Sequence, residues 1–213
     1  MLKYLLFDLD DTLYSTSAGL MEEISVRMNE YMMTRVGVPE SEVAELRQFY
    51  WRKYGTTLRG LYIERQIDAQ EFLEFVHDIE IAKYIATDPR LDAMLTQLAR
   101  HKFIFTNAPA SHARRVLAAL GIAKHFERIF DINFIAYESK PTPSGYAKVL
   151  SALGARGDEC LMIDDTARNL VPAKALGMRT VWLDGNHDPR TAEGCESADA
   201  VIHTIYEVEK MFH

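Results

Sequence analysis

Short apolar runs that alternate with helical segments are the feature that most constrains the fold of this chain. Each run is bounded by polar or turn-forming residues, which is typical of a buried strand, and the runs cover 4–7, 102–105, 128–132, 160–163, 180–183 and, as a weaker candidate, 200–202. Helical patterns at 111–120, 144–153 and 167–176 each end at a glycine, which readily closes a helix. This repeat of strand, helix and glycine predicts βα units and therefore an α/β fold with a parallel sheet.

The segment from residue 15 to residue 86 interrupts this repeat. It contains no clear strand pattern and instead carries several amphipathic helical stretches, MEEISVRMNEYMMTRV, SEVAELRQFYWRKY and AQEFLEFVH. A helical pattern at 89–100 then leads back to the sheet. We therefore predict an α/β core formed by residues 1–14 and 87–213, with a helical domain inserted at 15–86 and a closing helix at 205–213.

The composition narrows the class of protein. A chain of 213 residues with 48% hydrophobic and 26% charged residues is typical of a globular protein with a core of its own. Its net charge of −7 argues against a nucleic acid polymer as partner, because such binding needs clustered Lys and Arg. We find no apolar stretch of membrane-spanning length and no signal-peptide layout, so we expect a cytoplasmic monomer or small homo-oligomer with Cys160 as a reduced, buried thiol.

Polar and acidic residues gather where the predicted strands end. In an open parallel sheet, ligands bind outside the carboxyl ends of the strands. The residues at those ends are Asp8-Leu9-Asp10-Asp11-Thr12, Thr106-Asn107, Glu138-Ser139-Lys140-Pro141 and Asp164-Asp165-Thr166, with Asn169 shortly after the last group. Any one of these groups is a weak signal of catalysis, whereas four of them in this order indicate a functional site.

In this order the four groups resemble the motifs of the haloacid dehalogenase (HAD) superfamily of phosphohydrolases: DxDxT, a Ser or Thr, a Lys, and a paired acidic motif. The match covers nearly the whole chain, and the helical insertion resembles the small helical cap of that superfamily. The tracts YGTTLRGL (54–61) and SKPTPSGYAKVL (139–150) resemble its pyrimidine 5'-nucleotidase-like branch. The resemblance implies a Rossmann-like parallel sheet with a small inserted cap. It also implies a Mg²⁺ cofactor and a small phosphorylated metabolite as substrate, first of all a nucleoside monophosphate.

The resemblance also implies catalytic roles for three residues. Asp8 would attack phosphorus and form an aspartyl-phosphate, which divides one difficult hydrolysis into two easier steps. Asp10 would protonate the leaving alkoxide and then activate water, and this requires Asp10 to be protonated while Asp8 is ionised. Lys140 would neutralise charge in the transition state and hold Asp8 in place. A dehalogenase does not need an acid at position 10, so its presence favours phosphate chemistry.

A metal would explain why so many carboxylates are clustered. Two carboxylates about 4 Å apart repel by roughly 4 kcal/mol at an effective dielectric of 20, and a divalent cation removes that cost. Mg²⁺ prefers hard oxygen ligands. By the resemblance, the ligands are the Asp8 carboxylate, the Asp10 backbone carbonyl and the Asp165 carboxylate. Asp164 would contact a metal-bound water instead.

Other residues are expected to bind the substrate. The Thr106 hydroxyl and the Asn107 backbone N–H would hold phosphate oxygens, Arg59 in the inserted domain could contact a substrate carbonyl, and Thr12 would support the loop. Asp11 receives no role. The histidines lack metal-ligand spacing and are interpreted as surface or core residues: His77, His101, His112, His125, His187, His203 and His213.

Two other functions use the same sequence features. A phosphosugar mutase would have the same site but would keep its phosphoenzyme away from water. A non-catalytic module that binds phosphorylated ligands would be expected to have lost Asp8, Asp10 or Lys140, and all three are present. We therefore predict a Mg²⁺-dependent phosphatase that hydrolyses phosphomonoesters.

Overall fold

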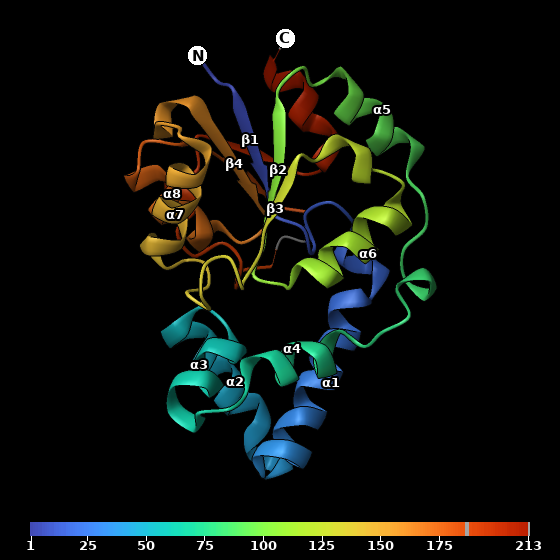
Figure 1. The fold of residues 1–213 in the computed structure, drawn as a ribbon, viewed down its shortest axis with the longest axis vertical. Helices are drawn as coiled ribbons and strands as arrows, with labels where there is room; N and C mark the ends of the chain where they lie inside the picture. Colours follow the sequence, from blue (N-terminus) through green and yellow to red (C-terminus); the bar gives the residue numbers. More distant parts are fainter. Residues whose placement is uncertain (186–187, 213) are drawn as a thin grey trace.

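The computed structural model describes residues 1–185 and 188–212, and its centre is a six-stranded sheet in the order β3-β2-β1-β4-β5-β6 (Figure 1). All neighbouring strands are parallel. The strands are β1 (Tyr4–Phe7), β2 (His101–Phe105), β3 (Arg128–Phe130), β4 (Cys160–Asp164), β5 (Arg179–Leu183) and β6 (Ala200–Ile202). The predicted parallel α/β fold is confirmed, with strand ends displaced by one or two residues. Because the chain proceeds from β1 to one side and returns to the other, a ligand crevice is expected beyond the end of β1.

Both faces of the sheet are covered by helices. Side chains alternate along a strand, so Leu5 and Phe7 contribute to one buried cluster and Leu6 to the other. The first cluster includes side chains of α5 (Pro89–Gln97), α6 (Ala110–Leu120) and η8 (Ile205–Phe212), and the second includes those of α7 (Pro143–Leu153) and α8 (Leu170–Ala175). Burial of each Leu or Phe in these layers contributes roughly 2 kcal/mol.

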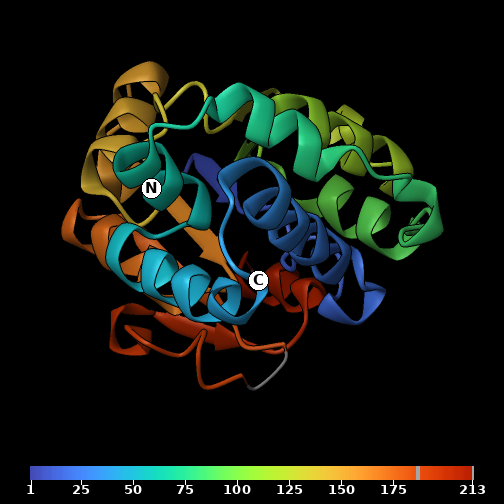
Figure 2. The same cartoon turned by 90° about the horizontal axis from the view of Figure 1, so that it is seen from below.

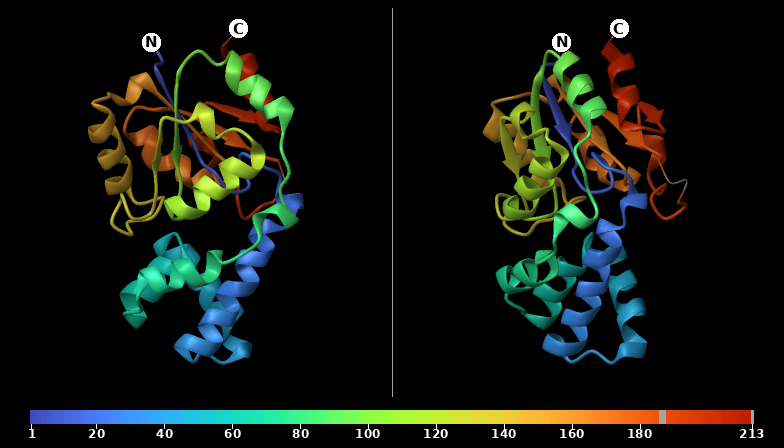
Figure 3. Two further views of the ribbon diagram at one scale, coloured as in Figure 1. Left: turned by 45° about the vertical axis from the view of Figure 1, so that its right-hand side comes forward. Right: turned by 90° about the vertical axis from the view of Figure 1, so that its right-hand side faces the viewer.

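The helices of residues 20–77 form a separate lobe beyond the carboxyl ends of the strands (Figure 1), and Figure 2 views the molecule from the side of this lobe. Its members are α1 (Leu20–Tyr31), η2 (Met32–Val36), α2 (Glu40–Tyr54), α3 (Thr57–Arg65) and α4 (Ala69–His77). We call residues 20–77 the helical lobe. Figure 3 shows the two connections to the core, one after β1 and one after α4. The domain limits at 15 and 86 stay a prediction.

Aromatic packing and capping explain why the lobe holds its shape. The rings of Tyr31 and Phe72 pack edge to face with centroids 5.0 Å apart, which joins the end of α1 to α4. Asp68 begins α4 by accepting hydrogen bonds from two backbone N–H groups at 2.8 and 3.2 Å. Asp88 begins α5 in the same way, with Pro89 in the first turn.

Two predicted helices differ in the structure. The pattern at 167–176 divides into the 3₁₀ turn η6 (Ala167–Asn169) and the short α8, which places Pro172 in a first turn, where a missing N–H is tolerated. The predicted closing helix is a 3₁₀ helix that ends at Phe212. His187 and His213 lie outside the described residues. No helix in the described part of the chain has the length and apolar character that a membrane span requires.

Candidate active site

Three carboxylates meet at the centre of the sheet edge. Phe7 of β1 pairs with Ile163 of β4, so the next residues, Asp8 and Asp164, lie side by side. Asp165 follows directly, and each of the three carboxylates offers one oxygen within 4.8 Å of the others. The parallel register therefore brings together residues that are far apart in the sequence. We call this group, together with Lys140, the catalytic floor.

Lys140 provides the positive charge of the catalytic floor. Its Nζ donates hydrogen bonds to Asp8 Oδ1 and Asp164 Oδ2, each at 2.7 Å, and the side chain is buried. Asn107 fixes the backbone of Lys140, since its Oδ1 accepts from the Lys140 N–H at 2.8 Å and its Nδ2 donates to the Lys140 carbonyl at 3.3 Å. Desolvation lowers the pKa of Lys140, but the two carboxylates outweigh it and the pKa lies above its ordinary value. The lysine is therefore charged.

The two neighbouring aspartates have different partners. Asp164 accepts hydrogen bonds from Lys140 and, at 2.8 Å, from Asn169 Nδ2, and it is fully buried. Asp165 is more open, and its carboxylate accepts two long hydrogen bonds, from Thr12 Oγ1 at 3.5 Å and from Thr166 Oγ1 at 3.4 Å. Thr12 also accepts the Asp165 N–H at 3.2 Å, so it joins the first loop to the fourth.

The catalytic floor has the donor set and charge that suit a divalent cation. Burial raises the pKa of Asp8 to about 7, because this effect and the Asp164 charge outweigh the opposing effect of Lys140. Burial and the Asp164 charge raise the pKa of Asp165 as well. Three carboxylates face one ammonium group, and a hard cation among their oxygens would favour the ionised forms. Asp8, Asp165 and the backbone of Asp10 could hold Mg²⁺, with Asp164 behind them.

Asp10 lies in a network that the sequence did not reveal. The Tyr14 hydroxyl donates to Asp10 Oδ1 at 2.6 Å, and His112 Nε2 lies 2.9 Å from the same oxygen. Burial raises the pKa of Asp10, but His112 and Tyr14 together outweigh it and the pKa lies below its ordinary value. The structure therefore differs from the expectation that Asp10, rather than Asp8, carries the proton, because a buried imidazole favours the ionised carboxylate.

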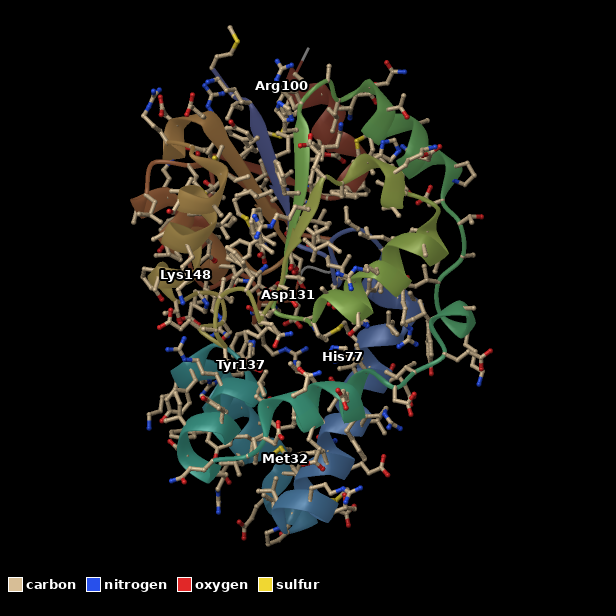
Figure 4. All side chains as sticks on the ribbon, viewed as in Figure 1. Met32, His77, Arg100, Asp131, Tyr137 and Lys148 are labelled. Atoms are coloured by element: carbon tan, nitrogen blue, oxygen red, sulfur yellow. The ribbon has the colours of Figure 1, made fainter. Side chains whose placement is uncertain are left out.

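His112 lies between Asp10 and the helical lobe. It lies in the first turn of α6, and its ring is 4.5 Å from that of His77 at the end of α4. Figure 4 labels His77 where the lobe meets the core. The interpretation of His112 as only a surface or core residue was incomplete: the side chain is buried, yet it contacts Asp10. One signal in the sequence could have indicated this role: His112 lies in the first turn of the helix that follows β2, at the carboxyl edge of the sheet.

A cavity of about 1220 Å³ separates the catalytic floor from the helical lobe. Its lining includes six of the predicted site residues: Asp8, Asp10, Thr106, Asn107, Lys140 and Asp165. Asp164 is buried behind them. The Thr106 hydroxyl accepts a backbone N–H at 3.0 Å. The phosphate-binding roles of Thr106 and Asn107 stay predictions.

Arg59, another predicted site residue, also lies outside the described lining of this cavity. Its Nη1 donates to Thr142 Oγ1 in the core. The tract around it serves as a junction, since the Ser139 hydroxyl donates to the Tyr54 carbonyl at 3.3 Å. At Gly55, whose φ is 93°, a Cβ would lie 2.6 Å from the Lys140 carbonyl oxygen, so only glycine permits this close approach.

Known proteins resemble this chain in sequence and in fold. Phosphate metabolism protein 8 of Saccharomyces cerevisiae is 28% identical over 195 residues, which cover 83% of this chain and 60% of that protein; the chain thus spans less than two thirds of that relative. Glyceraldehyde 3-phosphate phosphatase of Pyrococcus abyssi is 29% identical over 200 residues, covering 86% of this chain and 82% of that protein. The crystal structure of a HAD phosphatase from Thermococcus onnurineus shares the fold with a TM-score of 0.67, at 21% identity, over 99% of this chain and 98% of that one.

A family model also matches most of the sequence. It is described as haloacid dehalogenase-like hydrolase, and the match covers residues 2–177. The matched range includes the whole catalytic floor and the helical lobe. The chain therefore belongs to the haloacid dehalogenase-like hydrolases.

Proposed function

We propose that this chain is a Mg²⁺-dependent phosphomonoester hydrolase that acts through an aspartyl-phosphate on Asp8, and that its substrate is a nucleoside 5'-monophosphate. The observation that carries the proposal is the catalytic floor: Asp8 is bonded to a buried Lys140 at 2.7 Å and clustered with Asp164 and Asp165 beneath a large cavity. A cytoplasmic location and a monomer or small homo-oligomer, expected from the sequence, belong to the same proposal.

The catalytic floor, together with Asp10 and His112, divides the reaction into two steps. The Asp8 carboxylate attacks phosphorus, the bond to the leaving-group oxygen breaks, and the departing alkoxide takes a proton from the Asp10–His112 pair. Water then attacks phosphorus and returns a proton to the Asp10–His112 pair, while the bond between phosphorus and Asp8 breaks. This step releases inorganic phosphate and restores the Asp8 carboxylate. Bound Mg²⁺ would supply charge neutralisation between Asp8 and the phosphate dianion. Lys140 remains against Asp8 at 2.7 Å and reduces the same repulsion.

The relatives and the cavity support a small phosphorylated substrate. One similar protein is named a phosphatase of glyceraldehyde 3-phosphate. The cavity, about 1220 Å³, exceeds what a three-carbon substrate would fill and has room for a nucleotide. Thr57 and Leu58, from the tract that resembles the pyrimidine 5'-nucleotidase-like branch, line it. These features favour a nucleoside monophosphate.

Phosphate release from a panel of phosphomonoesters tests this proposal. The panel contains pyrimidine and purine monophosphates, nicotinamide mononucleotide and sugar phosphates, each with Mg²⁺ and with a chelator. Wild type is expected to release phosphate only with Mg²⁺, and Asp8→Asn is expected to lose at least roughly 10⁴-fold in kcat. Asp11→Asn is the matched control, because it removes a neighbouring carboxylate that has no assigned role.

The outcomes separate the alternatives. Equal activity of Asp8→Asn and wild type would contradict a nucleophilic Asp8. Phosphate transfer between positions of a sugar bisphosphate, without release, would indicate the mutase. A folded wild-type protein that binds phosphate esters and turns over none would indicate the non-catalytic module.

A further inference from the structure

The cavity wall opposite the catalytic floor contains a half-buried arginine, Arg47. Arg47 of α2 lines the cavity and reaches back to α1. Its Nη1 donates to Asn29 Oδ1 at 2.7 Å and to the Ser25 carbonyl at 3.1 Å, and its Nη2 donates to the Ser25 hydroxyl at 3.2 Å. Every one of these acceptors is neutral.

Arg47 differs from the surface arginines Arg156 and Arg190 in its missing counter-charge. Arg156 and Arg190 bond carboxylates at the surface. Arg47 forms no ion pair with any carboxylate of the described residues, and its Nε is buried without an acceptor. Burial is the only influence on its pKa, which it lowers. The charge of this guanidinium is therefore uncompensated within the described chain.

An uncompensated charge is a costly way to join two helices. Partial burial of a cation without a counter-charge is unfavourable, whereas a neutral glutamine could bond the same acceptors on α1. The cost is recovered when an oxygen with negative or partial negative charge enters the cavity beside Arg47. A ligand whose phosphate lies on Asp8 and Lys140 would extend toward the wall that includes Arg47, since both surfaces line one cavity.

We propose that Arg47 determines specificity by donating a hydrogen bond to an oxygen acceptor, a carbonyl or a carboxylate, on the leaving group of the substrate. The proposal rests on the proposed phosphatase function, because it assigns the leaving-group side of the same cavity. The acceptor has two chemical sources: the ring carbonyl of a nucleobase or the carboxylate of a small phosphorylated acid. Loss of a charge-assisted hydrogen bond of this kind lowers kcat/KM by roughly 10- to 100-fold.

Substrates that differ in this acceptor provide the test. Uridine 5'-monophosphate carries ring carbonyls, 2-phosphoglycolate carries a carboxylate, and adenosine 5'-monophosphate and phenyl phosphate carry neither. For Arg47→Met, kcat/KM is expected to fall roughly 10- to 100-fold with the uridine compound and to stay within roughly threefold with phenyl phosphate. Arg47→Lys keeps the charge and is expected to lose less. Arg65→Met is the matched control, because Arg65 is an exposed lobe arginine outside the described cavity lining.

Each outcome has a defined meaning. A loss confined to 2-phosphoglycolate supports the proposal and assigns the acceptor as a carboxylate. Equal losses on all substrates, with a lower Tm, would show that Arg47 only joins α1 to α2 and would overturn the proposal. Unchanged substrate ranking in an enzyme that still hydrolyses phenyl phosphate would overturn it while leaving the phosphatase function intact. Wild type that hydrolyses none of the four compounds would overturn both.

Discussion

The catalytic floor and the cavity wall formed by the helical lobe differ in whether their positively charged side chains are paired with carboxylates. On the floor, Lys140 lies 2.7 Å from both Asp8 and Asp164 and is almost completely buried. On the wall, Arg47 is bonded to neutral groups on α1. In the proposed reaction, the floor would contact the phosphate that every phosphomonoester shares, whereas Arg47 on the wall would contact a group that differs between substrates.

Lys140→Met tests the floor and should have the largest effect on stability. Removal of the lysine leaves Asp8 and Asp164 buried without their cation, which is expected to cost about 3–5 kcal/mol of unfolding free energy and to lower kcat by roughly 10²–10³-fold. Denaturant unfolding and steady-state kinetics measure the two losses. Lys148→Met is the control, because Lys148 forms a more exposed ion pair with Glu138 that is worth less than about 1 kcal/mol. If Lys140→Met lost as little unfolding free energy as Lys148→Met, this would contradict the pairing of Lys140 with Asp8 and Asp164.

The free energy of unfolding should depend on pH through His77, which lies where the helical lobe meets the core. Burial, and then the neighbouring His112, lower the pKa of His77 to about 4, whereas the unfolded chain has its ordinary value of 6.5. The unfolded state therefore binds a proton first, so stability is lost as the pH falls below 6.5, and the loss is complete near pH 4. This difference corresponds to about 3 kcal/mol.

Urea unfolding of wild type and His77→Gln between pH 7 and pH 4 measures this loss. The variant should lose about 3 kcal/mol less than wild type over the range, because glutamine does not titrate. His101→Gln, at an exposed site, is the control and should follow wild type. Parallel curves for His77→Gln and wild type would show that the histidine is not held neutral at the junction.

Metal binding should stabilise the folded protein through the carboxylates of the catalytic floor, and this gain should not depend on Arg47. A ligand that binds only the folded state raises the unfolding free energy by about 2.7 kcal/mol at 100 times its Kd. Thermal unfolding with Mg²⁺ and with a chelator is expected to show this gain in wild type and in Arg47→Met, and to show little of it in Asp165→Asn. An undiminished gain in Asp165→Asn would remove Asp165 from the ligand set.

The smallest expected effect belongs to His112, which contacts Asp10 beside the catalytic floor. His112→Ala should lower kcat by roughly 10- to 100-fold with little change in KM, because Asp10 loses a partner that orients it while the substrate contacts remain. His112→Gln, whose amide can donate to Asp10, should recover part of the loss. A fall in KM and kcat together for both variants, with lower Tm, would indicate a purely structural histidine.

The positions near the strand ends could be predicted from the sequence because their placement follows from local patterns. Short apolar runs identified the strands. Parallel pairing of these strands then brings Asp8 and Asp164 to one edge of the sheet, and this does not depend on the structure of the residues between them. Lys140 was predicted because it occurs at the expected place in the order of motifs. The structure places these residues together at the cavity, and their catalytic roles remain proposals.

The partners of these residues could not be predicted in this way. The sequence assigned substrate contact to Arg59, but the approach of Gly55 to the Lys140 loop turns that tract into a junction, and Arg47 lines the cavity instead. The contact of His112 with Asp10 depends on how α6 packs against the first loop. Helical periodicity shows which face of a helix is apolar, and it does not show which neighbour a polar side chain meets.

The sequence by itself therefore determined the parallel α/β fold and the group of residues at the sheet edge, because strand patterns, helix ends and strand-end positions are local properties of the chain. Only the tertiary structure decided that His112 and Tyr14 hold Asp10, that Arg59 faces the core, and that Arg47 faces the cavity without a carboxylate partner. These contacts join residues across the boundary between the helical lobe and the core or between distant loops. Their geometry is set by long-range packing, which no short stretch of sequence encodes.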